Sequence, residues 1–227
     1  MGTLFYNYIM TFLHPFSGHE KLREIRESMA QKDRERITII TNETIGEAPI
    51  KLSFLEAMSV SWAIRMVYAV YAIFSIHLGV VASKAMIDSE SYGNIFFNNF
   101  PMKSQQMVLL TALMAAIFYP FSMWVYTKFW GVLIKFFANL FNIKGNIDEM
   151  SDEIVNHSLV SNFFLLIPIF GEVAKHFSSL VYIFAGLRKN LGMTALQASV
   201  VIFSPVFLVV VFLMILLLYV LMIVNMF

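Results

Sequence analysis

Five hydrophobic segments follow one another between residue 54 and the end of the chain. They cover about residues 54–83, 105–127, 154–170, 173–187 and 195–226, with short polar stretches between them. Because an α-helix rises 1.5 Å per residue, about 20 apolar residues cross the hydrocarbon core of a bilayer. The first, second and fifth segments exceed that length, whereas the third and fourth are shorter. The pattern predicts an all-α fold, an integral membrane bundle of five transmembrane helices formed by residues 53–227.

The third and fourth segments differ from the others because polar and small residues interrupt them. These residues are Asn156, His157, Ser158, Ser161, Asn162, Ser178 and Ser179. In membrane helices such residues favour contact with other helices over contact with lipid. Only Gly171 and Glu172 separate the two segments, so we expect a central helical hairpin. The fifth segment is almost entirely aliphatic or Phe and is expected to face lipid over much of its surface.

Residues 1–52 form the predicted cytoplasmic and interfacial N-terminal region. Residues 1–16 are apolar and aromatic, which predicts a helix lying along the membrane with Tyr6, Tyr8 and Phe12 at headgroup depth. A capping box at Ser17 and Glu20 predicts that a charged, amphipathic helix starts there and runs over residues 18–36. Residues 37–40 and 49–54 are short β-prone runs that are compatible with a small hairpin.

The charged helix carries a narrow apolar stripe made of Leu22, Ile25 and Met29. These positions follow helical spacing, while the rest of the helix is Glu, Lys, Arg and Asp. The stripe predicts a docking face. It rests either on the membrane domain of the same chain or on a partner protein.

Local signals also mark where the membrane helices begin and bend. Ser53 and Glu56 form a second capping box at the start of the first span. Pro120 predicts a kink in the second span, whose helical pattern continues to about residue 141. Asn146, with Glu149 three residues on, is expected to cap the third helix.

The composition agrees with a membrane protein. Hydrophobic residues make up 59% of the chain, the mean hydropathy is +0.71 and only 14% of residues are charged, against about 25% in soluble domains. The net charge of +1 gives no indication of nucleic-acid binding. The absence of cysteine excludes disulfides, thiolate metal sites and cysteine nucleophiles.

The distribution of Lys and Arg predicts the orientation. With five spans and a cytoplasmic N-terminus, 12 of the 16 Lys and Arg residues fall in inside segments and three in outside segments, with Arg65 within the first span. Cytoplasmic loops of membrane proteins carry the excess of these residues. The count therefore favours a cytoplasmic N-terminus and an external C-terminus. Arg65 is expected to extend towards the cytoplasmic headgroups.

Residues 144–211 resemble the Yip1 domain family of five-span membrane proteins, in its bacterial form. The matching elements are IKGN at 143–146, LIPIFG at 166–171, AGLR at 185–188, LGMT at 191–194, Gln197 with Ala198, and Pro205; upstream, FLHPF at 12–16 is similar to the family's opening. The aromatic and glycine motif that eukaryotic members carry ahead of the first helix is absent. The resemblance therefore implies a five-helix protein of a bacterial inner membrane, without known catalysis.

The sequence contains few motifs that indicate a chemical activity. No Walker A, G-x-S-x-G or G-x-G-x-x-G motif is present, so no enzyme activity, cofactor or metal is predicted. Intramembrane polar and ionisable residues are candidates for function by default. These candidates are Arg65, His157, Asn162, Glu172, Lys175 and His176. Glu172 is placed to pair with Lys175 or His176 within one helical turn.

Two functions fit these observations. The first is a non-enzymatic membrane scaffold or accessory subunit that acts through protein–protein contacts, with other membrane proteins, further copies of itself and membrane lipids as partners. The alternative is a small transporter or channel with the polar residues of the central hairpin along its pathway. The orientation of those polar residues, towards one another or towards water, distinguishes the two.

Overall fold

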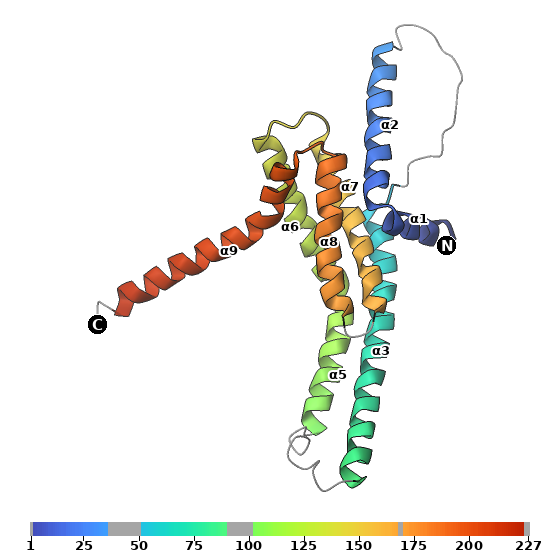
Figure 1. Ribbon diagram of the computed structural model, residues 1–227, viewed down its shortest axis with the longest axis vertical. Coiled ribbons are helices and arrows are strands. Elements are labelled where there is room, and N and C mark those ends of the chain that lie inside the picture. Colours follow the sequence, from blue (N-terminus) through green and yellow to red (C-terminus); the bar gives the residue numbers. More distant parts are fainter. Residues whose placement is uncertain (1, 36–50, 90–101, 168–169, 225–227) are drawn as a thin grey trace.

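The computed structural model describes residues 2–35, 51–89, 102–167 and 170–224. Every regular element among them is helical (Figure 1). The elements in chain order are α1 (Gly2–Leu13), α2 (Pro15–Glu35), α3 (Phe54–Ser89), α5 (Met102–Ile117), α6 (Tyr119–Leu140), α7 (Ile147–Ser158), the 3-10 helix η1 (Leu159–Leu166), α8 (Gly171–Lys189) and α9 (Ala195–Val224). The all-α prediction is confirmed for this part of the chain. The β-prone run at 37–40 and residues 49 and 50 lie outside it, whereas residues 51–53 are irregular and Phe54 begins α3.

Among the described residues, two helices are long and apolar enough to cross a membrane. They are Phe54–Gly79 within α3 and Ala195–Ile223 within α9. A third candidate arises if α5 and α6, which meet at an angle of 56°, count as one bent span. Membrane character is thus supported by length and composition. The third and fourth predicted segments do not meet the same criteria among the described residues.

The N-terminal region forms two helices that meet at a sharp corner. Figure 1 shows α1 lying across the upper part of α3, while α2 rises along the bundle and extends beyond it. The corner falls at His14, immediately before Pro15, since the residue before a proline is disfavoured in helical geometry. The predicted capping box at Ser17 is therefore wrong, because Ser17 lies inside α2. The expectation for Tyr8 is also wrong, because Tyr8 is fully buried in the bundle.

The start of α3 and the bend between α5 and α6 follow the predicted local signals. Glu56 accepts hydrogen bonds from the Ser53 backbone N–H at 2.9 Å and hydroxyl at 2.8 Å, and its own N–H donates to Ser53 Oγ at 3.3 Å. This confirms the capping box. The helix is interrupted at Phe118, and Pro120 occupies the first turn of α6, a position where its missing N–H is tolerated.

The predicted third helix is only partly α-helical. Asn146 caps α7, because its side chain accepts a bond from the Glu149 N–H at 3.4 Å. From Leu159 onwards the chain continues as η1. The pair α7–η1 packs against α8 as the predicted hairpin, and α3 and α6 flank it. The closest approach in the hairpin is at Gly186, where a Cβ would lie 2.7 Å from two side-chain carbons of Ile154.

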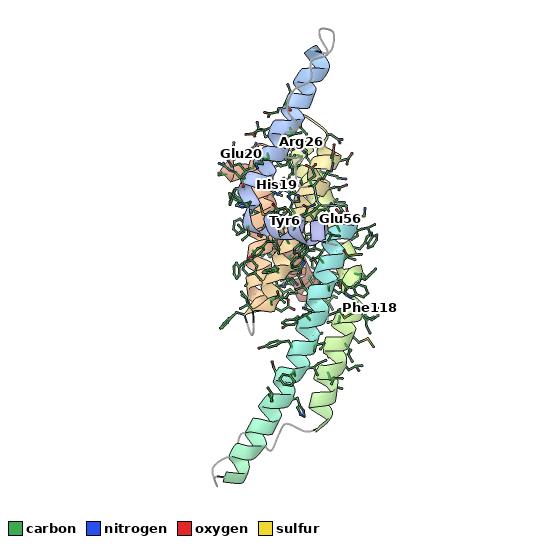
Figure 2. The ribbon with its side chains drawn as sticks, turned by 90° about the vertical axis from the view of Figure 1, so that its right-hand side faces the viewer. Tyr6, His19, Glu20, Arg26, Glu56 and Phe118 are labelled. Carbon is green, nitrogen blue, oxygen red and sulfur yellow. The ribbon has the colours of Figure 1, made fainter. Side chains whose placement is uncertain are left out.

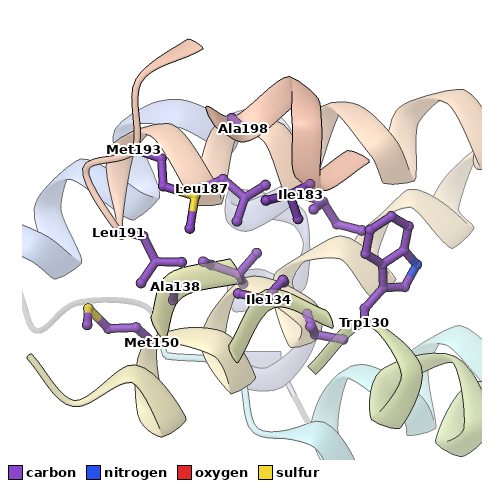
Figure 3. Close-up of a cluster of buried hydrophobic side chains, with 12 residues drawn as sticks. Trp130, Ile134, Ala138, Met150, Ile183, Leu187, Leu191, Met193 and Ala198 are labelled. Atoms are coloured by element: carbon purple, nitrogen blue, oxygen red, sulfur yellow. The ribbon is translucent and has the colours of Figure 1, made fainter. Parts of the chain in front are cut away.

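The largest hydrophobic core lies where α6, α7, α8 and the first turns of α9 meet (Figure 3). Ile134, Ile154, Ile183 and Leu187 are completely buried there, and Trp130 closes one end. A second core places Tyr8 among residues of α3, η1 and α8. The two cores fix the hairpin between the N-terminal helices and α6.

The final helix, α9, leaves this core. Ala198 and Val201 in its first turns are buried, but from Phe203 onwards its large side chains are mostly exposed. Figure 1 shows the helix pointing away from the other helices, with its end far from the bundle. The segment therefore exposes an apolar surface, and its contact with lipid stays a prediction.

Candidate functional site

A pair of histidines joins α2 to the central hairpin. His19 on α2 is fully buried and His157 at the end of α7 is 2% exposed. Their ring centroids lie 4.6 Å apart. Figure 2 shows His19 on the part of α2 that lies alongside the bundle. The pair therefore marks the contact between the N-terminal region and the hairpin.

The environment of His19 disfavours its charged form. Burial lowers the pKa of His19 well below its usual value, and the nearby His157 and Arg26 lower it further. Neither ring nitrogen of His19 has a hydrogen-bond partner among the described residues. At neutral pH this ring is a neutral part of the helix interface.

Next to the histidines, a buried carboxylate ties three elements together. Glu153 on α7 has a side chain that is only 6% exposed. Its Oε2 accepts hydrogen bonds from Arg26 Nη1 at 2.5 Å and from Asn190 Nδ2 at 3.1 Å. Its Oε1 lies 3.5 Å from Lys51 Nζ. A buried carboxylate is stable only when such partners compensate for its lost hydration.

The outer rim of this contact is more exposed. Lys189 at the end of α8 donates to Glu20 on α2 at 2.9 Å. Lys51 pairs with Glu149, and this hydrogen bond holds the pKa of Glu149 below its usual value and that of Lys51 above it. Such pairs contribute up to about 1 kcal/mol each. The Glu20–Lys189 pair fixes the orientation of α2 more than it stabilises it.

These contacts show where the predicted docking face of α2 lies. Leu22 is 4% exposed and Ile25 is partly buried, and α2 packs against α8. The face rests on the membrane domain of the same chain, one of the two predicted alternatives. The side chain of Met29 lies outside the described part of the structure.

A second charged cluster lies between α3 and α8. Arg65 donates a hydrogen bond to Glu172, and Lys175 lies 3.3 Å from the same carboxylate. The guanidinium also lies 5.0 Å from the ring centre of Tyr68 and 5.9 Å from that of Tyr119. The Arg65 side chain is 15% exposed and turned towards Glu172, and its extension towards the cytoplasmic headgroups stays a prediction.

Hydroxyl groups link the hairpin to its neighbours. The Tyr8 hydroxyl donates to the Leu159 carbonyl oxygen at 2.9 Å and lies 3.0 Å from Ser61 Oγ. On the other side, the Tyr126 hydroxyl contacts Ser158 Oγ at 3.1 Å and also Ser179. The polar residues of the hairpin thus face neighbouring helices, as predicted from their composition.

The six candidate residues therefore fall into separate places. Arg65, Glu172 and Lys175 form one cluster, and His157 belongs to the other. Asn162 lies within η1, where its Nδ2 donates to the Leu159 carbonyl oxygen at 2.6 Å. His176 is an exposed residue on α8. No path connecting all six is formed.

Sequence reasoning missed His19, Arg26, Glu153 and Asn190. No motif in the sequence singles out these four residues. The spacing of His19, Leu22 and Arg26 at i, i+3 and i+7 places all three on one helix face. A charge search along that face could have indicated a carboxylate partner, but not which one.

Neither a metal-binding arrangement among the described residues nor a known relative assigns a function to these clusters. Within the described residues, no group of three or more His, Asp or Glu side chains gathers in an arrangement that could hold a metal ion. Comparisons of the chain with protein-family models, with curated proteins and with solved structures find no match.

Proposed function

We propose that this chain is a non-enzymatic integral membrane scaffold or accessory subunit that acts through protein–protein contacts. The observation that carries the proposal is the attachment of α2. One face of this charged helix is held by the buried Leu22, by the Arg26–Glu153 pair and by the Glu20–Lys189 pair. A helix fixed along one face presents its other face in a constant orientation, which lowers the entropic cost of binding a partner.

The presented face is charged and mixed in sign. Lys21, Arg23, Glu24 and Glu27 are exposed. Arg23 and Glu27 pair with each other at 2.7 Å, whereas Lys21 and Glu24 have no ion pair within the described residues. Charge patterns of this kind set specificity and association rate in protein interfaces. The proposed partner is therefore a membrane protein with a complementary polar segment on the cytoplasmic side.

The proposed topology has five spans, with the N-terminus in the cytoplasm and the C-terminus outside a bacterial inner membrane. It is supported by the Lys and Arg distribution, by the resemblance to the Yip1 domain family and by the hairpin packing between α3 and α6. Because the chain has no cysteine, single cysteines placed at Lys144 and at the C-terminus can be labelled with an impermeant maleimide. The proposal requires opposite sides for these two positions, and the same side for both would refute it.

The alternative, a small transporter or channel, is supported by the Arg65–Glu172–Lys175 cluster, because charged groups within membrane helices often mark ion pathways. Two features weigh against it. The Glu172 carboxylate is already paired with both cations at short range. The cluster also lines neither of the two cavities detailed below for the described residues.

The test exchanges two charges on the presented face. The variant Lys21→Glu with Glu24→Lys keeps the net charge, the helix and the attached face. We expect a partner that co-purifies with the tagged wild-type protein in mild detergent to be lost from this variant. It should be retained by the control Lys144→Glu, which changes an exposed residue in the turn before α7. Equal recovery of the partner by both variants would contradict a role for α2.

Flux measurements distinguish a transporter or channel from a scaffold. In reconstituted vesicles, Glu172→Ala abolishes ion or solute flux if the cluster forms a pathway. If the protein is a scaffold, wild type and variant both show no flux above empty vesicles.

A further inference from the structure

The divergence of α9 from α6 opens an apolar groove between the two helices. The groove has a volume of about 730 Å³, within the range of about 300–1,000 Å³ that holds small organic ligands. Aromatic and aliphatic side chains line it, including Phe129, Phe136 and Leu133 from α6 and Phe207 and Leu208 from α9. In a bilayer, a wedge of this kind is filled by apolar matter, because water is excluded from the hydrocarbon core.

A polar cavity lies on the opposite flank of α6. It measures about 320 Å³, and its lining includes Thr127, Lys135, Asp152 and Asn156. Trp124, Lys128 and Val132 line both this cavity and the apolar groove. These three residues are spaced by four along α6 and form a ridge with one polar and one apolar side.

The charges around the polar cavity leave one cation available. Lys135 lies 2.8 Å from Asp148 and 3.9 Å from Asp152, so its charge is compensated. Lys128, on the ridge, is exposed and has no ion pair among the described residues. An anion in the cavity would therefore meet the unpaired ammonium group of Lys128, the polar side chains of Thr127 and Asn156, and the Asp152 carboxylate, which lies 3.9 Å from Lys135.

Two residues that line the cavity are of the kind found near a membrane surface. Phe54, which lines the cavity, is also the first residue of the candidate span in α3. Trp124 stands at the same place, and Trp and Lys are the residues that anchor membrane proteins at the interface. A molecule on this ridge can place its polar end in the polar cavity and its apolar part between α6 and α9.

The lining of the groove selects an acyl chain over a helix. Close packing of a second helix requires small residues at the contact. On α9, the residues that line the groove are Ser204, Phe207 and Leu208, and no Gly, Ala or Ser follows Ser204 along the helix. A flexible hydrocarbon chain can fit between bulky side chains that keep two helix backbones apart.

From these observations we propose that the ridge formed by Trp124, Lys128 and Val132 binds an anionic phospholipid. Its phosphate lies in the polar cavity against Lys128, and an acyl chain lies in the groove between α6 and α9. This site is separate from the presented face of α2, and it holds whether or not that face binds a protein.

The test uses native mass spectrometry of the full-length protein in detergent, titrated with phosphatidylglycerol or with phosphatidylcholine. We expect wild type to bind phosphatidylglycerol at least tenfold more tightly than phosphatidylcholine. Lys128→Ala should remove that preference, whereas Lys128→Arg should keep it. The matched control Lys144→Ala, which deletes an exposed charge in the turn before α7, should behave as wild type.

A second variant tests the groove independently of charge. Val132→Trp places a bulky ring on the ridge and should weaken binding of both lipids several-fold with an unchanged unfolding temperature. Binding of phosphatidylglycerol that is the same in wild type, Lys128→Ala and Val132→Trp overturns the proposal. Equal binding of the two lipids by wild type also overturns it.

Discussion

The hairpin of α7, η1 and α8 and the helix α9 both derive from hydrophobic segments, yet they occupy opposite environments. The hairpin buries Ser151, Glu153, His157 and Asn162 inside the molecule. In α9, most large apolar side chains beyond Phe203 are exposed. The difference follows from what surrounds each part, which we expect to be lipid for α9 and which is protein for the polar residues of the hairpin. In lipid an apolar surface loses nothing by exposure, whereas a polar group needs a partner that only the protein interior can supply.

The largest effect is expected from removing the buried carboxylate of Glu153. Glu153→Ala deprives Arg26 and Asn190 of their shared partner and should lower the free energy of unfolding by about 2–3 kcal/mol. The measurement is thermal or denaturant unfolding in mild detergent. Protease cleavage within α2 should also become faster, because the helix loses an attachment to the bundle.

Two control substitutions test whether the loss of stability is specific to the buried Glu153. Glu24→Ala removes an exposed carboxylate from α2, and Leu217→Ala shortens an exposed side chain of α9. Both should change the unfolding free energy by less than about 0.5 kcal/mol. A loss as large for Leu217→Ala as for Glu153→Ala would show that α9 is packed against the protein and that the contrast is mistaken.

A smaller effect is expected from one methyl group inside the hairpin. Gly186→Ala places a Cβ 2.7 Å from Cγ1 and Cγ2 of Ile154, a completely buried residue. Ile154 or the helix must shift to relieve this contact, and that shift should lower the unfolding free energy by about 1–3 kcal/mol.

The same substitution at Gly18 provides the control. A Cβ there meets no atom within 4 Å, so Gly18→Ala should stabilise α2 by about 0.5–1 kcal/mol. Opposite signs for the two variants are the expected result, and losses of equal size would contradict the close approach of the two hairpin segments. Combining Gly186→Ala with Ile154→Ala should cost less than the sum of the single changes.

The smallest expected effect is a pH dependence of the unfolding free energy that arises from His19. The pKa of His19 in the folded protein lies well below the value of 6.5 expected in the unfolded chain. Stability from the neutral ring is therefore complete above pH 6.5 and is lost as the pH falls, because the unfolded chain binds the proton first. Between pH 7 and pH 6 the loss should be about 0.7 kcal/mol.

The measurement is the unfolding temperature at these two pH values for wild type and for His19→Gln, which does not titrate. The difference between pH 7 and pH 6 should be reduced in the variant. An identical pH dependence in both proteins would show that His19 is not held neutral at the helix interface.

Local features of the fold were predictable because each depends on neighbours in sequence. The Ser53–Glu56 capping box, the bend before Pro120 and the Asn146 cap required only short spacings. The hairpin was predictable from its polar residues and its short turn. The prediction at Ser17 failed because the break at His14 and Pro15 comes earlier, and the Ser-x-x-Glu spacing alone does not show that a helix begins there.

The charged contacts were less predictable. Glu172 with Lys175 follows from helical spacing, but Arg65 joins them from a helix more than 100 positions away in sequence. The pairing of Arg26 with Glu153 and of His19 with His157 depends on how α2 lies on the hairpin. No local pattern carries that information, because a basic side chain on an amphipathic helix can pair with any acidic residue that the fold brings near.

The attachment of the first two helices has a consequence for biosynthesis. Tyr8 bonds to a carbonyl 151 positions later in the chain, Phe12 receives a bond from Tyr182 across 170 positions, and Glu20 pairs with Lys189 across 169. At about 5–20 residues per second, the ribosome needs on the order of ten seconds to make these partners after the N-terminus has emerged. During that interval α1 lacks these partners, so we expect it to be held at the lipid surface or shielded by a chaperone until α7, η1 and α8 have been made.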